Sequence, residues 1–209
     1  MPLQNRVLPT GEIVAAAWRG RMMGNRGCLH HPDRTLGQAR WRHANWVCCV
    51  TEFRGRHRLP MPPPGSRTIY TALFFWDEAA AFAAGHRPCA ECRNADYRRF
   101  KAAWIAAGND GVRAADLDRA LHRARVDRSA QRRVSTDSPA KLPIGSFILA
   151  EGTAAVITEG ATMRAWLEEG GYSTATPLPR GPVEILTPLP ILKVFEAGYT
   201  PAIDRPLPA

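Results

Sequence analysis

The sequence has no long hydrophobic run, and no stretch of about 18 consecutive apolar residues interrupts its mixed composition. A helix that crosses a membrane needs such a stretch, so we expect no transmembrane segment and no membrane partner. The N-terminus also lacks the apolar core of a signal peptide, because apolar residues 13–18 are followed at once by Arg19 and Arg21. We therefore expect a cytoplasmic protein.

Lysine is scarce, and cysteine is present at five positions. Of the 28 basic residues, 25 are arginine and only three are lysine. The five cysteines are better explained as metal ligands or reactive thiols than as disulfides if the protein is cytoplasmic. The sequence shows no internal repeat. It also lacks a His-Glu-x-x-His motif, the usual spacing of metal ligands in zinc hydrolases.

The positive charge is concentrated at the start of the chain. The net charge is +9, and residues 1–70 carry eleven arginines against three acidic residues, a net of +8. Residues 141–209 carry a net charge of −2. A basic first part of this kind could meet phosphate groups, which makes nucleic acid a candidate partner. A solvated surface in an arginine-rich chain is the competing interpretation.

Apolar residues make up 45% of the 209 residues, enough for one sizeable core or for a core with a small appendage. Residues 46–53 and 68–76 alternate or are β-branched and aromatic, which predicts strands. Asp77 is a candidate N-cap for a helix of small residues that ends at Gly85. Further helices are predicted from residues 94 and 114 onward.

The last third of the chain has a different pattern. Residues 132–143 read as a polar linker, residues 146–158 as a hairpin, and residues 183–186 and 191–195 as two more strands. We therefore predict an α+β fold. A zinc-stapled strand and helix unit over residues 1–133 is followed by a small β-rich unit over residues 144–209, which packs on the first.

The strongest local motif is Gly85-His86-Arg87-Pro88-Cys89-Ala90-Glu91-Cys92-Arg93. Two thiols two residues apart, in a proline-containing turn that leads into a helix, form half of a tetrahedral metal site. Zinc suits such thiolate sites best, so we expect a zinc cofactor. A thioredoxin-type redox motif follows a strand in a βαβ pattern, whereas this pair follows a helix.

The other half of the site has several candidates. Cys48 and Cys49 are adjacent on a predicted strand, where neighbouring side chains point to opposite faces, so only one of them should reach the metal. We expect Cys49 to do so, with Cys48 packed on the opposite face. Cys28 is the expected fourth ligand, and His30 and His31 are alternatives. The predicted metal ligands are therefore Cys28, Cys49, Cys89 and Cys92.

Residues 74–93, from Phe74-Phe75-Trp76-Asp77 to Arg87-Pro88-Cys89-Ala90-Glu91-Cys92-Arg93, resemble the end of the Ada-type metal-binding domain. That domain occurs in bacterial proteins that repair methylphosphotriesters in DNA. The resemblance implies that Cys89 and Cys92 are the second pair of zinc ligands. The first pair of that family, a Cys-x-x-x-Cys with a methyl-accepting cysteine, is absent here. The whole chain also resembles a widespread group of uncharacterised bacterial proteins with the same Arg-Pro-Cys-x-x-Cys core.

Three functional interpretations follow from a zinc site of this kind. In the first, the zinc is structural and nearby arginines bind nucleic acid, namely Arg26, Arg54, Arg56, Arg58 and Arg87. In the second, a zinc-bound thiolate accepts an alkyl group during DNA repair. In the third, the metal serves a nuclease, with His30, His31, Asp33, His57 and His86 as candidate parts. The sequence assigns no catalytic residue and no oligomeric state.

Overall fold

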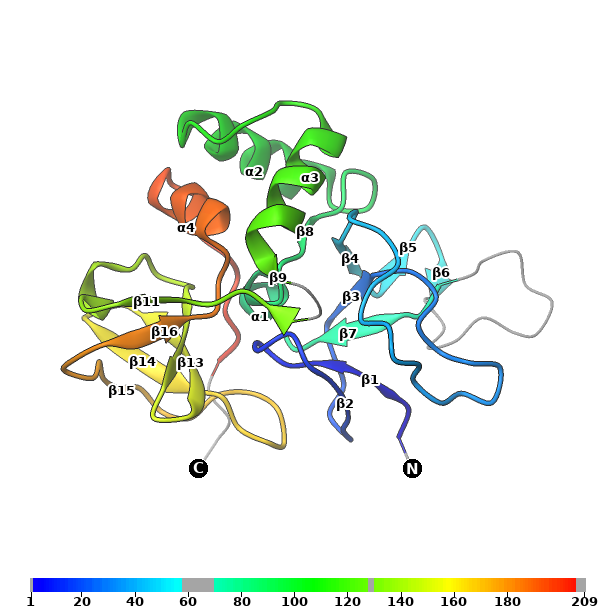
Figure 1. Ribbon diagram of the computed structural model, residues 1–209, viewed down its shortest axis with the longest axis horizontal. Coiled ribbons are helices and arrows are strands. Elements are labelled where there is room, and N and C mark those ends of the chain that lie inside the picture. Colours follow the sequence, from blue (N-terminus) through cyan, green and yellow to red (C-terminus); the bar gives the residue numbers. More distant parts are fainter. Residues whose placement is uncertain (1, 58–69, 128–129, 206–209) are drawn as a thin grey trace.

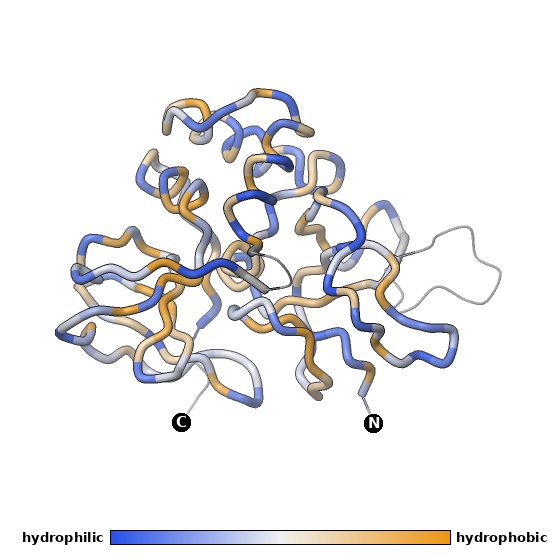
Figure 2. The backbone as a smooth tube through the Cα atoms, in the orientation of Figure 1, coloured by the Kyte–Doolittle hydropathy of each residue, from blue (hydrophilic) through white to orange (hydrophobic). Residues whose placement is uncertain are grey.

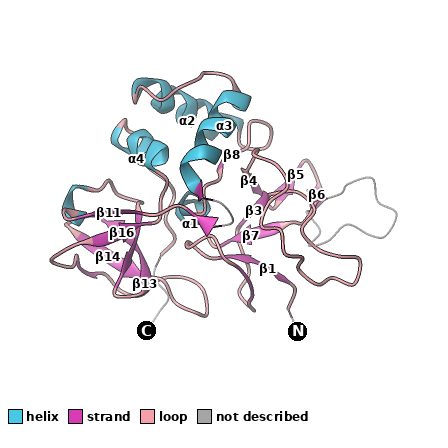
Figure 3. Cartoon of the chain, viewed as in Figure 1, coloured by secondary structure: helices cyan, strands magenta, loops and turns pink. Residues whose placement is uncertain are grey.

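The computed structural model describes residues 2–57, 70–127 and 130–205. Two six-stranded sheets lie side by side, and three helices gather on one side of the molecule (Figures 1 and 3). The predicted α+β class is confirmed, and so is the β-rich character of the C-terminal part.

Four of the strands of the first sheet come from the basic N-terminal part. Its strand order is β2 (Ile13–Ala15), β1 (Gln4–Val7), β7 (Leu73–Phe75), β3 (Met22–Asn25), β4 (Val47–Val50) and β8 (Arg87–Pro88). The pairs β1–β7 and β4–β8 are parallel, and the other pairs are antiparallel. A short hairpin of β5 (Glu52–Phe53) and β6 (Arg56–His57) follows β4.

Helix α1 (Glu78–Ala83) lies between the two sheets and is buried along its whole length (Figure 1). Its small residues allow both sheets to approach it closely. Asp77 caps its N-terminus, where the carboxylate accepts a 2.9 Å hydrogen bond from the backbone N–H of Ala80. At the other end, the guanidinium groups of Arg26 and Arg125 donate to the carbonyls of Ala84 and Gly85. Both ends therefore carry charges of the sign that the helix dipole favours.

The second sheet is antiparallel throughout. Its order is β11 (Val134–Thr136), β16 (Val183–Ile185), β12 (Phe147–Ala150), β13 (Thr153–Thr158), β14 (Thr162–Ala165) and β15 (Thr176–Pro177). The segment predicted as a linker, residues 132–143, instead supplies β11 and the 3-10 turn Pro139–Lys141. A small ladder of β9 (Val126–Asp127) and β10 (Ala130–Gln131) precedes it.

The three remaining helices pack on one another through aromatic and aliphatic side chains. They are α2 (Asn94–Ala106), α3 (Ala114–Arg125) and α4 (Leu189–Glu196). The strand predicted over residues 191–195 was wrong, because this segment lies in α4. Ile191, Val194 and Phe195 recur at helical spacing and are buried together, a pattern that a short apolar run does not distinguish from a strand. None of the described helices is long and apolar enough to span a membrane.

One hydrophobic cluster joins the two sheets. Trp18 and Trp76 from the first part of the chain pack with Ala79 and Ala83 of α1 and with Phe147 of β12. Trp18 and Trp76 also form an edge-to-face pair with ring centroids 6.1 Å apart. The two sheets therefore share a core around α1.

Candidate metal centre

The register of two parallel strands brings Cys49 and Cys89 together. Val47 of β4 is opposite Arg87 of β8, and Cys48 is opposite Pro88. Cys49 and Cys89, the residues that follow these pairs, are therefore neighbours. The backbone N–H of Cys89 donates a 3.0 Å hydrogen bond to the carbonyl of Cys48. Pro88 suits this position because β8 lies at the edge of the sheet, where a missing N–H is tolerated.

The turn after β8 adds a third thiol. Its shape is held by a 3.2 Å hydrogen bond from the backbone N–H of Arg93 to the carbonyl of Cys89, and α2 begins directly afterward. The sulfur atoms of Cys49, Cys89 and Cys92 all lie within 4.8 Å of one another. Cys49 is buried, whereas Cys89 and Cys92 are half-buried. This group of three thiols could hold a metal ion.

The electrostatics of the cluster favour one thiolate. The sulfur of Cys89 accepts hydrogen bonds from the S–H of Cys49 and from the backbone N–H groups of Cys92 and Glu91. These hydrogen bonds stabilise the thiolate and lower the pKa of Cys89 to about 5. The hydrogen bond that Cys49 donates, together with burial, raises the pKa of Cys49. Burial also raises the pKa of Cys92. The site therefore supplies a negatively charged sulfur at neutral pH, the form that binds metal ions.

Cys48 lies on the other face of β4, as the alternation of side chains along a strand predicts. It is buried in a separate cluster with Leu73 and Phe75, and its sulfur accepts a 3.6 Å contact from the guanidinium of Arg93. Burial raises its pKa to about 12. Cys48 is therefore a neutral thiol of the core.

The structure does not bring Cys28 to the three thiols. Cys28 is exposed at the start of the long segment between β3 and β4, and its sulfur contacts the carbonyl of His30 at 3.7 Å. The ring of His30 lies 3.1 Å from the Thr71 hydroxyl, and His31 is exposed nearby. Among the described residues, the group of three contains no fourth cysteine, histidine or carboxylate. The alternatives His30 and His31 are therefore not part of it either.

Two of the arginines predicted to bind nucleic acid are buried. Arg26 and Arg87 are each only 2% exposed. Arg26 donates to the carbonyls of Gly11 and Ala84, and Arg87 forms two 2.8 Å hydrogen bonds with Asp118. Net charge along a sequence does not distinguish buried, internally bonded arginines from a basic surface. In this structure neither guanidinium reaches solvent, which corrects the assignment of Arg26 and Arg87 to a phosphate-binding surface.

The other three predicted arginines fall in or beside the β5–β6 hairpin. Arg54 is exposed at its tip, with its guanidinium carbon 5.0 Å from the ring centroid of Phe53. Arg58 lies outside the described residues, and the side chain of Arg56 is not described. Of the candidate nuclease parts, His86 is completely buried and Asp33 is engaged by the hydroxyl of Thr35 at 2.7 Å. The side chain of His57 is not described, and the described members of this set form no group that could hold a metal ion.

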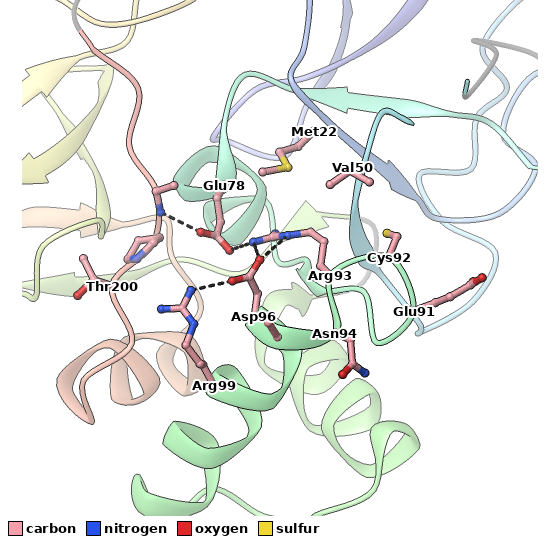
Figure 4. Close-up of a pocket in the computed structure, with 13 residues that line it drawn as sticks. Met22, Val50, Glu78, Glu91, Cys92, Arg93, Asn94, Asp96, Arg99 and Thr200 are labelled. Atoms are coloured by element: carbon pink, nitrogen blue, oxygen red, sulfur yellow. Dashed lines mark hydrogen bonds and ion pairs between the residues drawn. The ribbon is translucent and has the colours of Figure 1, made fainter. Parts of the chain in front are cut away.

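The sequence analysis missed the role of Arg93, the residue directly after Cys92. Its guanidinium contacts the carboxylates of Glu78 and Asp96, and Glu78 accepts a hydrogen bond from the backbone N–H of Ala202 (Figure 4). Glu78 also accepts a hydrogen bond from the hydroxyl of Tyr199. Arg93 thus ties the turn that carries Cys89 and Cys92 to α1, to α2 and to the C-terminal segment. The only signal in the sequence was its position inside the Cys89–Arg93 motif.

A pocket of about 650 Å³ adjoins the cluster (Figure 4). Cys92 and Val50 line one side, the first turn of α2 with Arg99 lines another, and Thr200 closes a third. Of the three cysteines, Cys92 is the one that lines this pocket.

Comparisons with protein-family models, with curated proteins and with solved structures found no match.

Proposed function

We propose that this chain is a cytoplasmic zinc-binding protein whose Ada-like module holds the metal through Cys49, Cys89 and Cys92 and which associates with nucleic acid. The convergence of three sulfur atoms within 4.8 Å carries this proposal. Thiolates are soft ligands that select zinc over magnesium or calcium. The resemblance of residues 74–93 to the Ada-type domain supports the same assignment for Cys89 and Cys92.

The number of sulfur ligands bears on what the metal does. Structural zinc sites have four protein ligands, and sites with three leave a fourth position for water or a substrate. The three convergent thiols support a site with one position not taken by cysteine, which differs from the four-cysteine set predicted with Cys28. The net charge of +9 supports the association with nucleic acid.

The metal assignment is tested by native mass spectrometry of purified protein. Wild type should carry one zinc ion per chain, and Cys49→Ser, Cys89→Ser and Cys92→Ser should each lose it, because each removes one of three ligands. Cys28→Ser and Cys48→Ser are matched controls that should keep the zinc. Loss of zinc in Cys28→Ser, or zinc-free wild type, would contradict the proposal.

A second candidate function is the transfer of an alkyl group to one of these thiolates, and the position of half-buried Cys92 at the pocket favours it. A thiolate sulfur would attack the methyl carbon of a methylphosphotriester. The sulfur–carbon bond forms as the carbon–oxygen bond breaks, and the oxygen leaves with the electron pair on a phosphodiester. Incubation with methylphosphotriester DNA should then add one methyl group per chain, located by peptide mapping. An unchanged protein mass would exclude this candidate.

A further inference from the structure

A cluster of cationic and aromatic residues lies away from the three thiols. It is centred on Arg40-Trp41-Arg42-His43, in the segment that joins β3 to β4 and that Figure 2 shows as largely hydrophilic. Arg40, Arg42 and His43 are exposed, and Trp41 is half-buried between them. We call residues 40–43 the tryptophan loop. In the sequence, its aromatic residue has an arginine on each side.

The arginines of the tryptophan loop have no carboxylate partner among the described residues. Within the described part of the chain, Arg40 donates to the carbonyls of its near neighbours Gly37 and Gln38. Some exposed arginines elsewhere are paired with carboxylates, as in Arg119–Asp116 and Arg133–Glu184. The guanidinium groups of Arg40 and Arg42 are therefore available to an external anion.

The ring of Trp41 packs against two other rings of the protein. Its centroid lies 5.8 Å from the ring of Trp46 and 5.8 Å from the ring of His122 on α3. An aromatic side chain that is already fixed loses little conformational entropy when a partner stacks on it. Trp41 is thus preorganised for stacking.

Two buried arginines lie beneath this surface. Trp46 contacts the guanidinium groups of Arg26 and Arg125, whose central carbons are 4.2 Å and 3.7 Å from its ring centroid. Within the described residues, neither arginine forms an ion pair with a carboxylate. Burial lowers the pKa of both arginines, well below its usual value for Arg125 and to about 9 for Arg26, which leaves Arg26 charged at neutral pH. Uncompensated charge in a low-dielectric interior raises the positive potential of the surface above it.

We propose that the tryptophan loop is a binding surface for single-stranded nucleic acid, an inference that rests on the proposed association with nucleic acid. Arg40 and Arg42 contact consecutive phosphates through their planar forks, and an unpaired base stacks on Trp41. A duplex keeps its bases stacked inside and offers no free base face to Trp41. A lipid headgroup offers phosphate but no aromatic face. The combination of ring and flanking arginines fits a single strand best.

The test measures fluorescence anisotropy of labelled oligothymidylate over a series of salt concentrations. The variant Arg40→Gln/Arg42→Gln should lower the slope of log K against log salt by roughly 1.4, since each phosphate contact on a single strand contributes about 0.7. Trp41→Leu should weaken binding by about 5- to 100-fold, in line with the loss of one stacked base, with a nearly unchanged slope. The matched control Arg119→Gln/Arg133→Gln removes the same charge from ion-paired positions and should bind like wild type.

Several outcomes would overturn the inference. An equal loss in Arg119→Gln/Arg133→Gln would show that only total charge matters. Binding of duplex as tight as that of the single strand, with no effect of Trp41→Leu, would exclude stacking. Binding of phosphatidylserine vesicles that depends on Arg40 and Arg42 and displaces the oligonucleotide would assign the surface to lipid. If wild type binds no oligonucleotide at all, the association with nucleic acid itself fails. If it binds and the loop variants bind equally well, only the tryptophan loop is excluded.

Discussion

The hydroxyl of Tyr172 donates a 2.8 Å hydrogen bond to the carboxylate of Asp77, which joins the β-rich C-terminal part to the N-terminus of α1. The same carboxylate accepts hydrogen bonds from the backbone N–H groups of Ala80 and Asp204. Asp77 thus connects three segments that are distant in the sequence. Since the two sheets also share a hydrophobic cluster around α1, we expect them to unfold together.

Replacing Tyr172 by phenylalanine should test this connection. Tyr172→Phe keeps the ring in its cluster but removes a donor to a buried carboxylate, so the free energy of unfolding should fall by about 1–2 kcal/mol. Urea unfolding followed by circular dichroism measures the change. Tyr97→Phe is the control, because the hydroxyl of Tyr97 has no hydrogen-bond partner within the described residues. Equal effects of the two substitutions would argue against the role of the Tyr172–Asp77 contact.

The stability should depend on pH through Asp77. Burial raises the pKa of its carboxyl group from 3.8 to about 6 in the folded protein. Between these values the folded state binds more protons than the unfolded state, so this group makes stability fall as pH rises from about 4 to about 6. Asp77→Asn removes the titration. The stability of wild type relative to Asp77→Asn should therefore decrease across this range, and a constant difference would contradict the assignment.

Buried Arg87 should be a structural residue. Arg87→Met leaves the carboxylate of Asp118 buried and unpaired, so the free energy of unfolding should fall by about 3–5 kcal/mol. The double variant Arg87→Met/Asp118→Leu removes both charges and should recover a large part of this loss. Thermal and urea unfolding of Arg87→Met, Asp118→Leu and the double variant give the coupling energy between the two side chains. Independent, additive effects would contradict the internal ion pair.

The reactivity of Cys89 should reveal its low pKa. In chelator-treated protein, alkylation of Cys89 by iodoacetamide should continue down to about pH 5, since the thiolate is the reactive form. Cys49→Ala removes the S–H donor and should move the midpoint of the pH profile upward. Peptide mapping by mass spectrometry follows the alkylation of each cysteine. A midpoint near 9 in both proteins would contradict the hydrogen bond between the two sulfurs.

Local patterns in the sequence predicted the parts of the site that depend on neighbouring residues. The spacing of Cys89 and Cys92 marks the turn, and the alternation of side chains along a strand separates Cys49 from Cys48. The α+β class followed from similar periodicities. These features need no knowledge of distant contacts.

Features that depend on tertiary packing were not predicted. The sequence does not reveal that Arg87 meets Asp118 or that Arg26 meets the end of α1, because those partners are distant in the chain. Cys28 looked like a fourth ligand only because it is a cysteine upstream of β4. The division into residues 1–133 and 144–209 stays a prediction, and expression of the two parts separately would test it.

The central claim is that Cys49, Cys89 and Cys92 together bind zinc. X-ray absorption at the zinc edge of the loaded protein tests it most directly. We predict three sulfur ligands at about 2.3 Å and one lighter oxygen or nitrogen ligand at about 2.0–2.2 Å. One sulfur should disappear from the zinc spectrum of any Cys49→Ser, Cys89→Ser or Cys92→Ser protein that still retains metal. A spectrum with four sulfur ligands, or with none, would contradict the three-thiol site.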